Sequence, residues 1–350
     1  MLDVILYREK EGLGAEPFLA AIEAKIPAGD FIKRCESAAD LKEGAEKTSA
    51  ILALYAESQA LPTKAGRTID PVTPEDIIKW CPILQSPFQY GLTDGQKNAL
   101  GKADKVLTGI PAYDLARSYI KLHRFAQPET VLAFLTENPK QLTNAQKIAV
   151  LNAQDGKNAY ETAGFANPFR ADSDALAIGA AFGVAFAPQP EIAAENAMKY
   201  ALVSYLKGGV YAAMWMAAMI AHASTISDPE VFTVRSLSCV PIPSMWFRAV
   251  AWMQRNLNCK VDAAECAKDL VRVVCHHGVT RDEGAITDPE PDEIMKKFIQ
   301  NGAYSNAMAV AAALLYSEGD PKKALDNVDL FGCDISLNRS LVKAVTVLMK

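Results

Sequence analysis

The sequence predicts an all-α protein with one large helical domain. Helix-start signals recur along the chain: Thr73-Pro74 places a capping hydroxyl before a proline at the first helical position, and Asp262-Ala-Ala-Glu265 has the form of a capping box. Strand signals are limited to two short apolar segments, 231–234 and 240–243, and prolines interrupt the second. The chain has no glycine-rich phosphate loop and no alternation of strands with helices, which argues against a doubly wound sheet.

The helices can be placed in chain order from their capping and apolar residues. Residues 17–25 begin with a proline and continue in strong helix formers. Segments 175–187 and 208–223 are apolar, but each is shorter than the roughly eighteen residues that a bilayer requires. We therefore expect two buried helices and no membrane span. Residues 306–316 are rich in alanine and leucine, and the turn at 317–321 ends that helix.

Several side chains in these helices are expected to have an ordinary packing role. The interior of the 208–223 helix would be filled by Met214, Trp215, Met216 and Met219. His123 and His222 lie in largely apolar helical stretches, so we expect both to be packed rather than catalytic.

The composition limits the classes of function. The net charge is −5, and half of the residues are apolar, which is typical of a globular protein with a sizeable core. A nucleic-acid surface would need a clustered basic excess, and none is present in the sequence. The seven cysteines form no Cys-x-x-Cys pair, which suits a reducing compartment. We therefore expect an intracellular, cytoplasmic protein that binds neither nucleic acid nor membrane.

The domain organisation is predicted to have two parts. Residues 1–45 would form a helical extension and residues 46–350 the large domain. The extension has apolar residues at helical spacing, namely Phe18, Leu19, Ile22 and Ile26. A helix of this length is marginal alone in water, so it must pack on its own domain or on a partner.

The C-terminal part carries two linked motifs. A helix that opens Asn306-Ala is followed by a Gly319-Asp320 turn and then by Gly332-Cys-Asp-Ile-Ser-Leu-Asn338. This arrangement resembles the ADP-ribosylglycohydrolase (crystallin J1-like) family, in which a Gly-x-Asp-Thr-Asp-x-Asn motif follows such a helix and turn. The resemblance implies the all-helical domain of that family.

Further segments match the family in the same order along the chain. Residues 240–252 match the family's proline–serine turn and the helix after it. Asn167-Pro-Phe-Arg170 stands where the family has an Asn-Gly-x-x-x-Arg stretch, and Ser204-Tyr205 stands at the family's helical Thr-His pair. Thr93-Asp94-Gly95 matches the Thr-Asp-Asp-Thr motif without its second aspartate. Residues 51–64 can be laid on the first helix of the family. The resemblance thus spans about residues 46–350.

The resemblance also indicates which metal ligands remain. Active members hold two Mg²⁺ ions beside ADP-ribose with six side chains from the first and last motifs. Of these positions, Thr93, Asp94 and Asp334 keep the family residue. The other three hold Gly95, Ser336 and Leu337. Magnesium demands octahedral oxygen ligation, which glycine and leucine side chains cannot supply. We therefore expect no cofactor or a single Mg²⁺. The order of the motifs also predicts that the carboxylates of Asp94 and Asp334 face each other across one cleft, within about two helical turns or roughly 11 Å.

Other positions of the implied site are also changed. Lys64 occupies the position of a family acidic residue, and Glu57 keeps an acid as a remnant of the catalytic region. Asn167 and Arg170 are the candidates for ligand binding, although Arg170 could instead pair with Asp172 or Asp174. Without the resemblance, Thr93-Asp94 and Asp334 would be interpreted as ordinary helix caps.

The sequence leaves three functions open. The first is a catalytically inactive relative with a structural or protein-interaction role in a larger assembly. The second is a Mg²⁺-dependent hydrolase that cleaves ADP-ribosyl glycosidic bonds. The third is a module that binds ADP-ribose without cleaving it.

Overall fold

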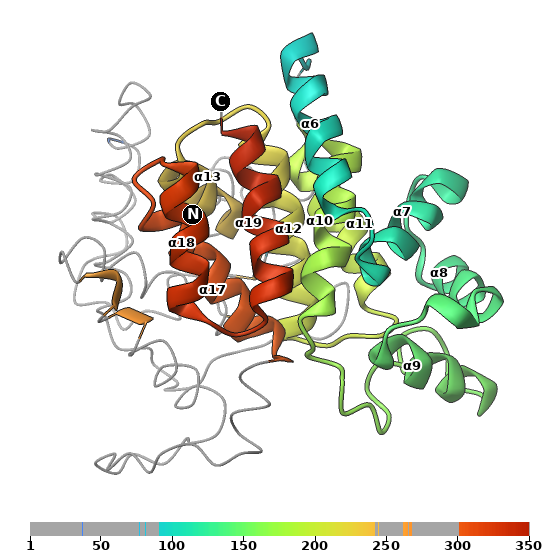
Figure 1. The fold of residues 1–350 in the computed structure, drawn as a ribbon. Helices are drawn as coiled ribbons and strands as arrows, with labels where there is room; N and C mark the ends of the chain where they lie inside the picture. Colours follow the sequence, from blue (N-terminus) through green and yellow to red (C-terminus); the bar gives the residue numbers. More distant parts are fainter. Residues whose placement is uncertain are drawn as a thin grey trace, which may run out of the picture.

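The computed structural model describes residues 91–241 and 301–349, together with residues 37, 77, 81, 244, 262–264 and 266–267. Within these ranges the regular elements are helices, and an isolated antiparallel bridge joins Asp172 to Gly302 (Figure 1). The all-α prediction is confirmed. The proposed extension, 1–45, falls outside the described residues apart from Ser37.

The helices follow one another in this order: α6 (Asp94–Leu107), α7 (Pro111–His123), α8 (Pro128–Glu137), α9 (Asn144–Gln154), α10 (Asp174–Phe186), α11 (Pro190–Ala201), α12 (Gly208–Ala223), α13 (Pro229–Ser236), α17 (Ala303–Leu315), α18 (Pro321–Phe331) and α19 (Ile335–Leu348). Two short 3-10 turns, η2 (Pro139–Gln141) and η3 (Leu237–Cys239), follow α8 and α13. Among the described helices, none combines the length and the apolar character that a membrane span requires.

The centre of the bundle is α12, which packs on α10 and α11 and is almost entirely buried (Figure 1). Its core side chains are those expected from the sequence: Met214, Trp215, Met216 and Met219 are all fully buried. The apolar character of the segment on every face fits this position, because a helix surrounded by other helices needs no polar side.

Two glycines bring α10 and α12 unusually close. A Cβ atom at Gly179 would lie 2.2 Å from the carbonyl oxygen of Ala213, and one at Gly183 would lie 2.8 Å from that of Ala217. These glycines are four residues apart and therefore share one face of α10. The missing side chains allow backbone to approach backbone along that face.

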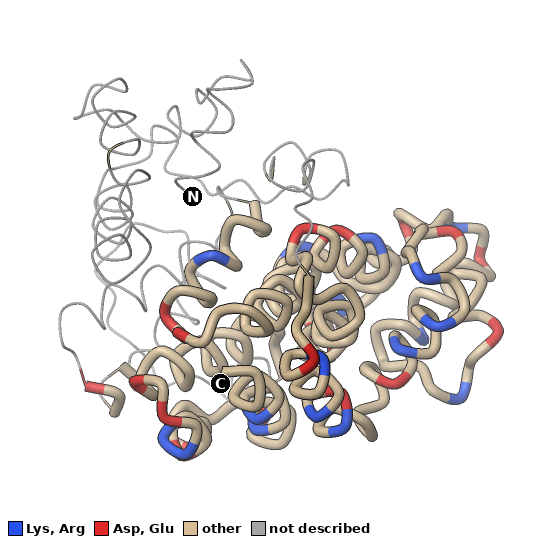
Figure 2. The backbone as a smooth tube through the Cα atoms, turned by 90° about the horizontal axis from the view of Figure 1, so that it is seen from above, with Lys and Arg blue, Asp and Glu red and all other residues tan. Residues whose placement is uncertain are grey.

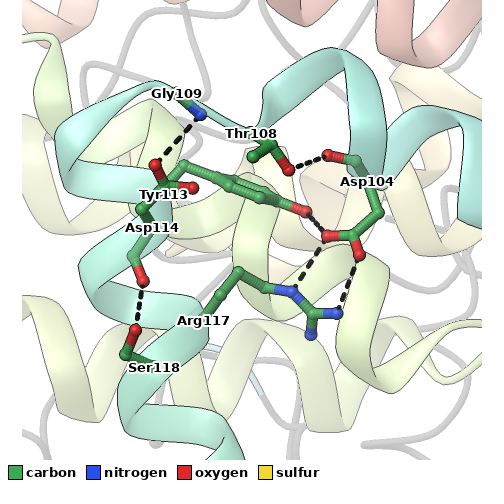
Figure 3. A network of polar contacts seen from close by, with 7 residues as sticks. All are labelled: Asp104, Thr108, Gly109, Tyr113, Asp114, Arg117 and Ser118. Carbon is green, nitrogen blue, oxygen red and sulfur yellow. Dashed lines mark hydrogen bonds and ion pairs between the residues drawn. The ribbon is translucent and has the colours of Figure 1, made fainter.

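A polar network fixes the corner between α6 and α7 (Figure 3). The Tyr113 hydroxyl donates to the carboxylate of Asp104, and Arg117 donates to both of its oxygens, at 3.0 Å from Nε and 3.3 Å from Nη2. Burial raises the pKa of Asp104, but these donors more than offset it and leave the pKa below its ordinary value. The network therefore holds a charged carboxylate between the two helices.

Two expectations from the sequence are wrong at the local level. Segment 231–234, a weak strand signal, lies inside α13, because Asp228 caps that helix and Pro229 occupies its first position. The Asp228 carboxylate accepts from the backbone N–H of Glu230 at 2.9 Å. His123 is exposed at the end of α7, although its ring lies against Tyr119 with centroids 4.8 Å apart.

His222, unlike His123, has the packing role expected from the sequence. It lies in the last turn of α12 and is partly buried, and burial together with nearby Arg235 lowers its pKa to about 3. A histidine with such a low pKa is neutral at physiological pH and is not poised to exchange a proton there.

Candidate functional site

Thr93 and Asp94, the first pair of predicted metal ligands, begin α6. Thr93 is the N-cap residue of a capping box: its backbone N–H donates to Gln96 Oε1 at 2.9 Å, and its Oγ1 accepts from the Gln96 N–H at 3.3 Å. The Asp94 side chain is 98% exposed and forms an ion pair with Lys97 at 3.0 Å. Both residues therefore have the geometry of an ordinary helix start.

Asp334, the third predicted ligand, begins α19. Its carboxylate accepts from the Leu337 N–H at 3.0 Å, which makes it the N-cap residue. Its own N–H donates to Asn306 Oδ1 at 2.8 Å, and Asn338 Nδ2 donates to the same oxygen at 2.9 Å. Asn306 and Asn338 are fully buried, so this shared oxygen ties the start of α19 to α17.

The structure does not bring the two motifs together. In Figure 1, α6 runs down towards α7, whereas α19 beside it runs up to the marked C-terminus. Asp94 and Asp334 each lie at the start of their helix and hence at opposite ends of this antiparallel pair. A helix of 14 residues, the length of both α6 and α19, is about 20 Å long. The expected arrangement, in which these carboxylates face each other across one cleft, is not present.

The carboxylate of Asp174 lies near Asp334 instead, and that of Asp172 lies near Asp174. Asp172 and Asp174 flank the start of α10, and both are partly buried. Burial raises the pKa of Asp172 to about 6, with the charge of Asp174 as a second cause. Burial, followed by the charge of Asp334, likewise raises the pKa of Asp174. Within the described part of the chain, neither side chain has a hydrogen bond or ion pair, and no described Lys or Arg side chain offsets their charge.

From the sequence alone, Asp172 and Asp174 are expected only as possible partners for Arg170. The available signal was an Asp-Ser-Asp sequence directly before an apolar helix, which is also an ordinary helix start. Within the described part of the chain, the structure contains no group of three or more His, Cys, Asp or Glu side chains arranged to hold a metal ion.

Asn167, a candidate for ligand binding, is fully buried and used internally. Its Nδ2 donates to the carbonyl oxygens of Ala145 at 3.1 Å and Ser204 at 3.0 Å, and its Oδ1 accepts from the Phe169 N–H at 3.1 Å. Both amide protons and the oxygen thus bind backbone groups. Asn167 joins the start of α9 to the turn before α12.

Arg170, the other candidate, lies on the surface. Its Nη1 donates to the Asn167 carbonyl oxygen at 2.9 Å, so the alternative in which it pairs with Asp172 or Asp174 is not found. Its backbone carbonyl accepts from the Leu206 N–H at 2.9 Å. The exposed guanidinium keeps donors that no described residue uses.

Ser204 and Tyr205, which stand at the Thr-His position of the resemblance, are both buried. The Tyr205 hydroxyl bonds to Thr143 Oγ1 at 3.0 Å. Burial, followed by the charge of Asp174, raises the pKa of Tyr205 well above its ordinary value. Tyr205 is therefore a neutral interior group.

Glu57 and Lys64, the remaining positions of the implied catalytic region, lie outside the described residues.

Comparison with known protein families gives a match over most of the chain. The model of the family described as ADP-ribosylglycohydrolase matches residues 55–337. No curated protein and no solved structure gives a significant match. Because residues 55–337 make up most of the chain, the protein belongs to the ADP-ribosylglycohydrolase family.

Proposed function

We propose that this chain is a catalytically inactive member of its family, whose helical domain has a structural or protein-interaction role in a larger assembly. The observation that supports the proposal most directly is the separation of Asp94 from Asp334 at opposite ends of α6 and α19. A two-metal centre needs carboxylates that are shared between ions about 4 Å apart. Carboxylates at opposite ends of a helix pair do not fit such a centre.

The chemistry of the remaining donors also argues against a paired metal site. The Asp334 carboxylate already accepts a hydrogen bond as the cap of α19. Gly95 offers no side-chain oxygen, and Leu337, whose N–H is the donor to Asp334, has an apolar side chain. The residues at these positions therefore do not fit the two Mg²⁺ ions that the family resemblance implies.

The test is a hydrolysis assay on the purified full-length protein with millimolar Mg²⁺. We expect no release of ADP-ribose from modified arginine, from modified serine or from O-acetyl-ADP-ribose. The assay includes Asp334→Asn as a matched variant, because asparagine keeps the capping function while it removes the charge. Turnover by the wild type that disappears in Asp334→Asn would overturn the proposal in favour of a Mg²⁺-dependent hydrolase.

Retained ADP-ribose binding is the second candidate, and the exposed guanidinium of Arg170 is the feature that favours it. Such a group can bind a phosphate through two parallel hydrogen bonds. Calorimetric titration with ADP-ribose separates this candidate from the first. Saturable binding that is lost in Arg170→Ala but kept in Arg124→Ala, another exposed arginine, would identify a non-cleaving binding module.

The expected kind of partner is a protein. Figure 2 shows acidic and basic residues interspersed over the described helices rather than gathered in one basic stripe. Nucleic-acid binding would need clustered lysine and arginine, so this distribution gives no support for such a partner.

A further inference from the structure

We draw no further inference here: the strongest candidate, the group of partly buried carboxylates of Asp172, Asp174 and Asp334 at the starts of α10 and α19, is an acidic cluster within the region already described, and no contact in the described part of the chain identifies a ligand for it.

Discussion

At the scale of single residues, the polar side chains around the start of α19 act on the backbone. Asp334 caps the helix, and Asn306 receives hydrogen bonds from both the Asp334 N–H and the Asn338 amide. Gly332 and Cys333, just before the cap, have φ of 71° and 64°. For cysteine this left-handed conformation is strained, so the turn is held by the bonds around it.

Replacing Asp334 tests its capping role. We expect Asp334→Ala to lower the free energy of unfolding by about 0.5–2 kcal/mol, because the Leu337 N–H loses its acceptor, and Asp334→Asn to remain near wild type. Asp94→Ala is the control and should change stability by less than about 0.5 kcal/mol, because Asp94 is exposed and Thr93 carries the cap. Urea denaturation measures all three. Equal losses of unfolding free energy in Asp334→Ala and Asp94→Ala would contradict the capping role of Asp334.

The raised pKa of Asp172 predicts the sign of a pH dependence of stability. Its pKa rises from 3.8 to about 6 on folding, so the folded state binds this proton more tightly than the unfolded state does. The contribution to stability is therefore complete below about pH 4 and is lost as the pH rises to about 6. Asp172→Asn should be more stable than wild type at pH 7, by on the order of 1 kcal/mol after solvent screening of this half-exposed group.

Urea denaturation of the Asp172→Asn variant and the wild type across pH 4 to 7 measures this effect. Glu137→Gln, which removes an exposed carboxylate at the end of α8, serves as the control and should not reproduce the gain at pH 7. A difference between Asp172→Asn and wild type that is the same at every pH would contradict the assigned cause.

At the scale of elements, the closest helix contact depends on residues that have no side chain. Gly179 and Gly183 let α10 meet the backbone of α12. The corner between α6 and α7 is held in the opposite way, by a charged carboxylate with a tyrosine and an arginine as donors (Figure 3). Small residues thus set the distance between α10 and α12, and a polar network sets the angle between α6 and α7.

A glycine-to-alanine pair tests the close approach. In Gly179→Ala the new Cβ would meet the Ala213 carbonyl oxygen at 2.2 Å, so backbone must shift, and we expect a loss of about 1–3 kcal/mol or more. Gly101→Ala in exposed α6 meets nothing within 4 Å and should instead raise stability by about 0.5–1 kcal/mol. Thermal and urea unfolding compare the two. Similar effects of the two substitutions would show that α10 and α12 are not packed this closely.

At the scale of the whole molecule, the family match and the helical bundle agree. The match covers 55–337, and the described helices surround the buried α12. The proposed inactive domain would persist only if its surface or its bulk is useful, so we propose a stable assembly rather than a free monomer. The segment 1–45 begins before the matched region and is the proposed docking element.

Deleting residues 1–45 tests that role. We expect the truncated protein to keep its helical circular dichroism and cooperative unfolding, while its association weakens, because an apolar helical stripe would be removed from the interface. Light scattering after size-exclusion chromatography gives the mass of both forms. The opposite result would be a truncated chain that unfolds and a full-length chain that elutes as a monomer without a co-purifying protein. In that case the segment belongs to the core, and the scaffold role loses its support.

The sequence by itself determined the helical class and much of the local structure. The all-round apolar segment at 208–223 predicted a buried helix, because only a helix enclosed by others has no polar face. The helix-start patterns at Thr93 and Asp334 also fit ordinary caps, the interpretation that the sequence allows without the family resemblance, because capping depends on residues three positions apart in the chain. The order of the motifs predicted the family.

Only the tertiary structure decided which helix ends meet. The starts of α6 and α19 carry the residues of a proposed site, but the antiparallel packing of these helices places those residues apart. The carboxylate near Asp334 is instead that of Asp174. Arg170 and Asn167 are likewise distinguished only by burial, one on the surface and one inside. Caps and periodicity arise within a few residues, whereas the direction of one helix against another depends on contacts between distant segments that no local pattern encodes.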